Sequence, residues 1–432
     1  MWGEGIRIGK AVLPAKHETK HILLTGSTGS GKTNAIHHMI PQLREKKRQG
    51  VIVDTTGDYI ARYYDPARDF ILNPFDRRSQ GWHPWAEILQ QTDYKAVARC
   101  FLPLPEEKHH PDRFWNLAAS SIFESLLKQT SSEENVFEFK NLLLSASLEQ
   151  LHSKLEGTKG APYVAKEGEK TAHSIRATLS SNAECLEHLR ETQDPFSISY
   201  WIRSQQKDSF LFLSCLESQR SDLIPLLSAW LGIAIKALMS LGKDYNRRVA
   251  FICDEFAAMG PIAGITSLLR EGRKYGACAI LATQNPSQID SIYGKSIAED
   301  IFSNLRTKLV FAEEEPKIAK RLSQLFGEKE EMEAEEGISY GAHEMRDGVT
   351  QSMRVRNRPV ITSTQIQELK DNQCFLKLCG GEAIEKLHFN YIDACDIAEP
   401  FEAREDGVER EPKEEQPSEE KKTKEASCAT AN

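Results

Sequence analysis

Residues 21–33 read His-Ile-Leu-Leu-Thr-Gly-Ser-Thr-Gly-Ser-Gly-Lys-Thr, an apolar run that leads into a glycine-rich turn. The residues after this turn predict a helix of about four turns. That helix ends in the basic cluster at 46–48, where cations suit the negative end of a helix dipole, and Gly50 stops it. Val-Ile-Val-Asp at 51–54 is a second short apolar strand. Strand, helix and strand at this spacing form a βαβ unit, which requires a parallel sheet.

Five more apolar runs predict further strands of this sheet, at residues 210–215, 249–253, 278–283, 308–312 and 374–378. Continuous apolar strands with polar tips are typical of a parallel sheet covered by helices on both faces. Between residue 85 and about 190 the apolar period is helical instead, as in residues 114–127 and 171–189. We therefore expect an α/β fold with an inserted all-helical domain.

Size and composition are those of a soluble globular protein of two or three domains: 432 residues, 40% hydrophobic and 27% charged. The 9 cysteines form no C-x-x-C pair, and this odd number indicates a reducing cytosol rather than a disulfide framework. A net charge of −8 gives no overall attraction for nucleic acid, so any DNA contact must come from local basic surfaces. The apolar run 226–241 contains Lys236 and is too short for a membrane helix, so it predicts a buried core helix.

The glycine-rich turn matches the phosphate-binding pattern G-x-x-x-x-G-K-[ST] at every fixed position. Its glycines let backbone N–H groups converge on a phosphate, and the following helix adds its positive end. Lys32 is expected to bridge the β- and γ-phosphates of ATP, and Thr33 to place a hydroxyl on Mg²⁺. The predicted nucleotide-binding residues are Gly26, Ser27, Thr28, Gly29, Ser30, Gly31, Lys32 and Thr33.

Two acids, Asp254 and Glu255, follow the apolar strand at 249–253. With a phosphate loop upstream in a parallel sheet, this pair predicts a metal-associated carboxylate and a water-activating one. We assign Asp254 to Mg²⁺ through a water molecule, and Glu255 to activation of the attacking water.

Two further polar sites are candidates for the same chemistry. Gln284 ends the strand at 278–283 and is a candidate γ-phosphate sensor, with an ordinary loop amide as the alternative. Arg273 lies in Glu-Gly-Arg-Lys-Tyr-Gly at 271–276 and is a candidate arginine finger that acts across a subunit boundary. A solvated basic helix end is the alternative there.

Together these motifs resemble the conjugative type IV coupling proteins of the TraD and TrwB kind, relatives of the FtsK and HerA translocases. The resemblance covers roughly residues 1–395. Its most specific passage is Tyr64-Asp-Pro-Ala-Arg-Asp-Phe-Ile-Leu-Asn-Pro-Phe-Asp76, followed by Trp82 and Trp85, and Asp347-Gly348-Val349 also looks familial. The phosphate loop and the stretches at 252–256, 271–276 and 282–284 carry the rest.

The resemblance implies a RecA-like nucleotide-binding domain in two parts, 1–84 and 193–398, interrupted by an all-α domain at 85–192 and followed by a disordered tail at 399–432. It implies a homo-hexameric ring with single-stranded DNA in the central channel and nucleotide sites between subunits. Lys32, Thr33, Asp254, Glu255, Gln284 and Arg273 then take the family's roles in binding and hydrolysing Mg-ATP. The implied task is to receive DNA from a relaxase and its relaxosome and to pass it to a type IV secretion channel.

One departure from the family concerns the membrane. Such proteins usually begin with a transmembrane anchor, and none precedes the phosphate loop here, so the chain as given is expected in the cytoplasm. The alternatives are a cytosolic part of a protein that is anchored in the inner membrane when complete, and a protein without an anchor that docks by other contacts. The start Met1-Trp2-Gly3 favours the first.

Alternatives to a conjugative DNA translocase are a nucleotide-gated docking scaffold and an FtsK- or HerA-like chromosomal DNA pump. Phe114 and Trp115 offer a stacking platform for DNA bases, but their helical spacing favours a core role. His109 and His110 with Asp112 lack further metal ligands at suitable spacing and are assigned to a loop.

Overall fold

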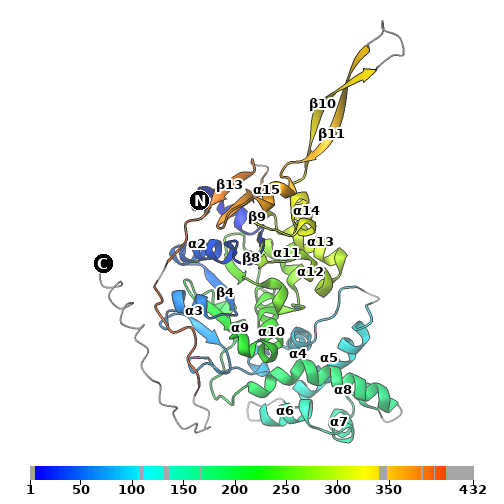
Figure 1. Cartoon of the computed structure of the whole chain (residues 1–432). Helices are drawn as coiled ribbons and strands as arrows, with labels where there is room; N and C mark the ends of the chain where they lie inside the picture. Colours follow the sequence, from blue (N-terminus) through cyan, green and yellow to red (C-terminus); the bar gives the residue numbers. More distant parts are fainter. Residues whose placement is uncertain are drawn as a thin grey trace, which may run out of the picture.

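A twisted nine-stranded sheet forms the centre of the protein, seen in a computed structural model of the whole chain (Figure 1). The structure describes residues 5–107, 110–130, 136–165, 168–339, 348–380, 383–393 and 395–404. In spatial order the strands are β13 (Glu385–His388), β12 (Gln373–Lys377), β9 (Thr307–Phe311), β3 (Ile22–Thr25), β8 (Ala277–Thr283), β7 (Val249–Cys253), β4 (Gln49–Asp54), β6 (Phe210–Ser214) and β5 (Phe70–Leu72).

From β9 to β5 every pair of neighbouring strands is parallel, as predicted from the apolar runs. The edge differs, because β12 runs antiparallel to β9 and β13 antiparallel to β12. The sheet is therefore mixed, and the predicted strand at 374–378 belongs to its antiparallel edge. A strand that joins its neighbour in antiparallel orientation needs no helical crossover. The helices α14 (Pro316–Gln324) and α15 (Ser363–Gln367) instead pack with β12 in a small separate core.

The strands are buried on both faces, so their alternate residues enter two different cores. Ile22 and Leu24 pack under the helices on one face, whereas Leu23 faces the other. The first face is covered by the hairpin of β1 (Ile6–Ile8) and β2 (Ala11–Leu13), by α2 (Lys32–Glu45) and by α3 (Asp58–Tyr63), with the short α1 (Ala15–Glu18) beside them. The second carries α4 (Gln91–Phe101), α9 (Ile198–Ser204), α10 (Arg220–Met239), α11 (Ile265–Glu271), α12 (Pro286–Tyr293) and α13 (Lys295–Asn304).

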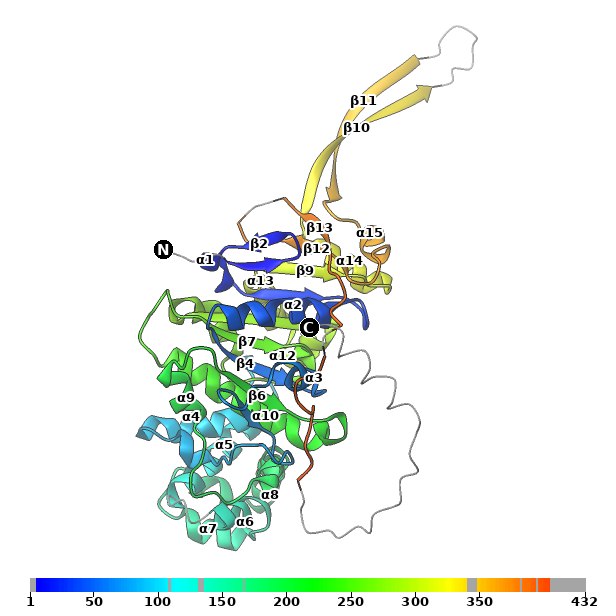
Figure 2. The same ribbon diagram turned by 90° about the vertical axis from the view of Figure 1, so that its left-hand side faces the viewer.

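The predicted helical insertion is present at the β5 end of the sheet (Figure 2). It comprises α5 (Arg113–Gln129), α6 (Val136–Leu144), α7 (Leu148–Leu155) and α8 (Glu169–Ala183), and the described residues of 85–192 contain no strand. Its core is continuous with that of α4 and α10, in part through Trp82, which contacts Trp230 edge to face. The exact boundaries at 84/85 and 192/193 stay predictions.

The helix α10 was expected to be too short to cross a membrane, and this was wrong. Together with the preceding turn it spans Glu217–Met239, 23 residues, and among the described residues it is the one helix long and apolar enough for a membrane. However, 72% of its apolar 18-residue stretch is buried inside the protein, so it serves as the core helix that the sequence predicted.

Other local expectations also need correction. Gly50 does not stop α2, which ends at Glu45, and Lys47 turns the chain with φ 53° while Gly50 lies inside β4. The tail does not leave the body at residue 399. The N–H groups of Ile397 and Ala398 donate to Ala61, and Arg404 donates its N–H to Phe75, so residues up to 404 lie along α3 and β5. The predicted disorder of the rest of the tail, and Asp347 and His109, lie outside the described residues.

The family-specific passage at 64–76 anchors the β5 edge of the sheet. Asp69 is buried and accepts two hydrogen bonds from the Arg44 guanidinium, at 2.9 and 2.7 Å, and one from the Phe210 N–H at 2.8 Å. Because β5 is very short, this fixed polar contact between α2, β5 and β6 supplies order that strand pairing alone would not.

Candidate nucleotide site

The predicted functional segments converge at one edge of the sheet. Strands β3, β8 and β7 are neighbours and parallel, so their carboxyl ends meet. The phosphate loop follows β3, Gln284 follows β8, and Asp254 and Glu255 follow β7. Ligands of parallel α/β sheets bind outside the carboxyl ends of the strands, and here the topology brings the motifs together at that place.

The phosphate loop is held from below by two segments far along the chain. The Ser27 N–H donates to the Ala312 carbonyl at 2.8 Å, and the Asn372 N–H donates to the Ser30 carbonyl at 2.9 Å. Gly31 has φ 109°, and a Cβ there would lie 2.7 Å from the Asn372 Oδ1. A side chain at Gly31 would therefore be both strained and obstructed, which explains the glycine that the motif requires.

Lys32 occupies the centre of the loop. Its Nζ donates to the carbonyls of Gly26 and Ser27, each at 2.8 Å, and the side chain is buried. Burial lowers the pKa of this ammonium, while the nearby carboxylates of Asp254, Glu255 and Glu313 oppose the shift. The two backbone carbonyls thus hold the Lys32 ammonium inside the loop, where phosphate oxygens would take their place as its hydrogen-bond acceptors.

Thr33 and Asp254 form the candidate magnesium site. The Thr33 Oγ1 donates to the Asp254 Oδ2 at 2.6 Å, so a hydroxyl and a carboxylate oxygen adjoin the phosphate loop. The described chain holds no group of three or more His, Cys, Asp or Glu residues suited to a metal. One carboxylate and a hydroxyl nevertheless fit Mg²⁺, which is commonly bound by one or two protein ligands together with substrate phosphates and water.

Tyr59, in α3, also belongs to this site, although nothing in the sequence indicated it. Its hydroxyl donates to the same Asp254 Oδ2 at 3.0 Å. Burial raises the pKa of Tyr59 well above its ordinary value, with the Asp254 carboxylate adding to the effect, so the phenol remains a donor. Two donors thus fix the orientation of one carboxylate. No motif signals Tyr59, since its approach depends on how α3 packs beside β7.

We expect Tyr59→Phe to raise the Mg²⁺ concentration needed for half-maximal ATP turnover by about tenfold. A hydrogen bond to a charged group contributes about 1.5–3 kcal/mol, and its loss frees the Asp254 side chain. The measurement is a Mg²⁺ titration of the ATPase rate. Tyr63→Phe is the control, because the Tyr63 hydroxyl contacts His37 instead. An unchanged Mg²⁺ requirement in Tyr59→Phe would exclude a positioning role.

Glu255 and Gln284 lie next to each other at the strand tips. The Thr28 Oγ1 donates to the Gln284 Oε1 at 2.8 Å, linking the loop to the tip of β8. Burial raises the pKa of the Glu255 carboxyl, while Lys32 and a hydrogen bond with Gln284 lower it. The Glu255 Oε1 is buried and has no partner among the described protein groups, which suits an atom that binds a water.

Arg220, at the start of α10, also reaches this place and was not predicted. It lines a cavity of about 480 Å³ together with Glu255, Gln284 and Gln288, and its charge opposes the rise in the pKa of Glu255. An arginine at the first position of a helix carries no sequence signal for such a role, because its neighbours come from two other strands.

Arg273 does not join the site of its own chain. It is exposed in a short turn (Gly272–Tyr275) before β8, whereas Gln284 follows the other end of that strand. Within one chain the two residues therefore lie at opposite edges of the sheet. A role in the nucleotide site of this same chain is excluded by that placement, and a role in a neighbouring chain stays a prediction.

The remaining candidates fall elsewhere. Phe114 is 48% exposed, so the core role favoured for it was wrong, while Trp115 packs partly against the core. His110 lies in a loop near Asp112, as expected, with 3.8 Å between the Nδ1 and the carboxylate oxygen.

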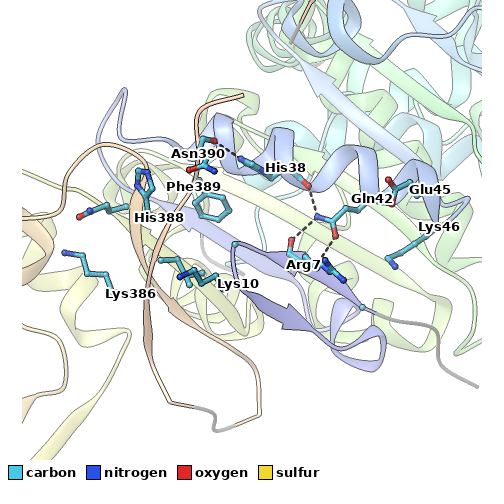
Figure 3. A pocket seen from close by; sticks show the side chains of 14 residues that line it. Arg7, Lys10, His38, Gln42, Glu45, Lys46, Lys386, His388, Phe389 and Asn390 are labelled. Atoms are coloured by element: carbon cyan, nitrogen blue, oxygen red, sulfur yellow. Dashed lines mark hydrogen bonds between the residues drawn. The ribbon is translucent and has the colours of Figure 1, made fainter. Parts of the chain in front are cut away.

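A larger cavity, of about 1040 Å³, lies on the outer face of α2 between the β1–β2 hairpin and β13 (Figure 3). Gln42 joins helix to hairpin, accepting from the Arg7 N–H and donating to the Arg7 carbonyl. The cavity adjoins the second half of α2, whereas the phosphate loop precedes the first, and of the described residues that line it only Glu45 is an acid. It lacks the acidic pair of a nucleotide-hydrolysing site.

The chain resembles known proteins in sequence. A family model described as the type IV secretion-system coupling protein DNA-binding domain matches residues 5–390. The coupling protein TraD of Escherichia coli (strain K12) is 32% identical over 414 residues, which cover 94% of this chain and 57% of that relative. The chain thus spans little more than half the length of this curated relative.

Solved structures show the same fold. The unbound monoclinic form of the conjugative coupling protein TrwBdeltaN70 superposes with a TM-score of 0.82 at 24% identity, covering 94% of this chain and 92% of that one. The plasmid coupling protein TrwB in complex with the ATP analogue ADPNP gives 0.81 at 24% identity, covering 93% and 92%. VirB4 of Thermoanaerobacter pseudethanolicus gives 0.54 at 12% identity, covering 91% and 97%. The expected fold, a sheet flanked by helices with a helical insertion, is confirmed.

Proposed function

Because the chain belongs to the family of type IV secretion-system coupling proteins, we propose that it is an ATP-driven DNA translocase that links a relaxosome to a secretion channel in conjugation. The observation that carries the proposal is the contact of the Thr33 hydroxyl with the Asp254 carboxylate, which joins the phosphate loop to the acidic strand tip. Many phosphate-binding loops bind nucleotide, but a motor also needs a carboxylate beside the attacking water, and Glu255 supplies it.

In the proposed reaction Lys32 leaves its two backbone carbonyls and donates to the β- and γ-phosphate oxygens of ATP. Thr33 and Asp254 would hold Mg²⁺, which neutralises charge on the phosphates. Glu255 accepts a proton as a water oxygen bonds to the γ-phosphorus. The bond from that phosphorus to the bridging oxygen then breaks, giving ADP and phosphate. Gln284, hydrogen-bonded to Thr28 and next to Glu255, reports whether the γ-phosphate is present.

The proposed assembly is a homo-hexameric ring with single-stranded DNA in its channel. Arg273 is exposed and lies at the opposite edge of the sheet from the phosphate loop, which supports the proposal that it acts in the site of a neighbouring chain. Relaxase proteins and components of the secretion channel are the proposed partners. The complete protein is proposed to be anchored in the inner membrane with this part in the cytoplasm.

A translocase should hydrolyse ATP faster in the presence of single-stranded DNA, because productive turnover requires a ring that is assembled around DNA. We expect the ATPase rate to rise severalfold with DNA and with protein concentration, and to be lost in Arg273→Ala. Mixing Arg273→Ala chains with Lys32→Ala chains should restore part of the rate, because mixed rings contain boundaries with one intact lysine and one intact arginine. An ATPase rate that changes neither with DNA nor with protein concentration would instead favour a nucleotide-gated docking scaffold.

A further inference from the structure

A long two-stranded ribbon projects from the β13 end of the sheet, on the side away from the helical insertion (Figures 1 and 2). It consists of β10 (Glu328–Ser339) and β11 (Gly348–Pro359), paired antiparallel over their whole length as a sheet of their own. Two-stranded hairpins are marginally stable in water, and both outer edges of this one present unpaired backbone groups. We therefore expect this ribbon to be stabilised by contact with another polypeptide.

One face of the ribbon carries uncovered apolar side chains, with the exposed Glu330 beside them. Met332 lies opposite Val355 in the register, and Met353 shares the face of Val355 because strand side chains alternate. Their exposed fractions are 76%, 60% and 77%. The other face is charged: the Glu331 carboxylate contacts Lys329 at 2.6 Å and Arg358 at 3.6 Å. Apolar side chains this exposed, gathered on one face, indicate an interaction surface.

The two strands carry opposite charge. In sequence β10 contains six glutamates and one lysine, whereas β11 contains three arginines and no acid. Two β10 strands set side by side would therefore place like charges across from one another, which destabilises a sheet. A β10 strand beside the β11 strand of another ribbon places glutamates next to arginines, as Glu331 lies opposite Arg356 within each ribbon. The charges thus select a head-to-tail arrangement of copies over a two-fold symmetric pair.

The base of the ribbon is tied to the phosphate loop. The chain leads from Ala312 through α14 into β10, and returns from β11 through α15 to Asn372. These two residues are the ones that hydrogen-bond the loop, at Ser27 and Ser30. The ribbon therefore rises from the nucleotide edge of the sheet, which is the subunit boundary in the proposed ring. In a ring the ribbons of all chains point in the same direction. Because β10 runs away from the sheet and β11 runs back toward it, the β10 of one chain would lie antiparallel to the β11 of the next.

We propose that the ribbons of successive copies of this chain pair β10 to β11 and close into an antiparallel β-crown over one mouth of the ring. The crown removes the open edges of every ribbon and gathers Met332, Met353 and Val355 of neighbouring ribbons on one common face. The surface is thus an interface between copies of this chain. The inference rests on the proposed ring and adds the contact that closes it.

The test reverses the charges of the ribbon. One variant carries Glu331→Lys, a second carries Arg356→Glu and Arg358→Glu, and a third carries all three changes. Each half-reversed chain should assemble about tenfold more weakly, since cross-strand charge pairs contribute about 0.2–1 kcal/mol each. The fully reversed chain should regain assembly. Mass photometry of each chain with ATP and single-stranded DNA measures these effects.

The decisive arm mixes wild-type and fully reversed chains that carry different fluorophores. Pairing between copies predicts sorting, with energy transfer between the two kinds of chain about tenfold lower than among wild-type chains. Free mixing of the two kinds would overturn the crown, because charges that act only within one ribbon cannot sort copies. The control exchanges the Lys154–Glu138 pair of the helical insertion, Lys154→Glu with Glu138→Lys, which should mix freely with wild type. If wild-type chains form no assembly at all, the ring itself is wrong, whereas rings that mix freely contradict only the crown.

Discussion

Replacing Lys32 by alanine should weaken ATP binding by about 10²–10³-fold and reduce hydrolysis below detection, because the variant loses a preorganised cation aimed at the phosphates. The loss has a second source in this site. The carboxylates of Asp254, Glu255 and Glu313 all act on Lys32, so its removal leaves an acidic environment around a polyanionic ligand. Isothermal titration with an ATP analogue and Mg²⁺ measures the affinity directly.

The control for this experiment is Lys46→Ala at the other end of the same helix. Lys46 follows the last residue of α2 and lines the cavity of Figure 3 instead of the phosphate loop. It should bind the analogue like the wild type. Equal affinity of the Lys32→Ala variant and the wild type would show that the nucleotide does not use this loop.

Replacing Glu255 by glutamine should leave ATP binding intact and lower the hydrolysis rate by about 10²–10⁴-fold, the usual contribution of a positioned general base. The amide keeps the size of the side chain but cannot accept the proton of the attacking water. Single-turnover hydrolysis, with binding measured separately, distinguishes this outcome from lost affinity. Glu368→Gln, an exposed residue after α15, serves as the control.

The pH dependence of the rate gives a further check on Glu255. Burial raises the pKa of this carboxyl above its ordinary value. The base must be ionised to act, so the rate should fall as the pH is lowered, beginning at a higher pH than an exposed glutamate would give. A Glu255→Gln variant with nearly wild-type turnover would contradict the assigned role.

The parts of the site that could be predicted from the sequence are those whose signal is local. The phosphate loop has its residues within one turn and one helix start, and the acidic pair directly follows an apolar strand. Their meeting required only that parallel strands share a carboxyl edge. Tyr59 and Arg220 escaped prediction because each depends on how separate elements pack around the tip of β7.

The elements that were missed lack an apolar period. The strands β1, β2 and β5 are only three residues long, and β10 is rich in glutamate, which is depleted in strands generally. The antiparallel edge was missed for another reason, since strand direction depends on the connection between β9 and β12 rather than on the strand's own residues. Phe114 illustrates the limit of periodicity, because a helical repeat shows which residues share a face but not whether anything covers it.

The most direct test of the nucleotide site is a crystal structure of this chain with an ATP analogue and Mg²⁺. We predict the metal between the Thr33 hydroxyl, the Asp254 carboxylate and the phosphates, with Lys32 turned from the carbonyls of Gly26 and Ser27 toward the phosphates. Nucleotide bound elsewhere, for example in the basic cavity on the outer face of α2, with Lys32 still on those two carbonyls, would contradict the account.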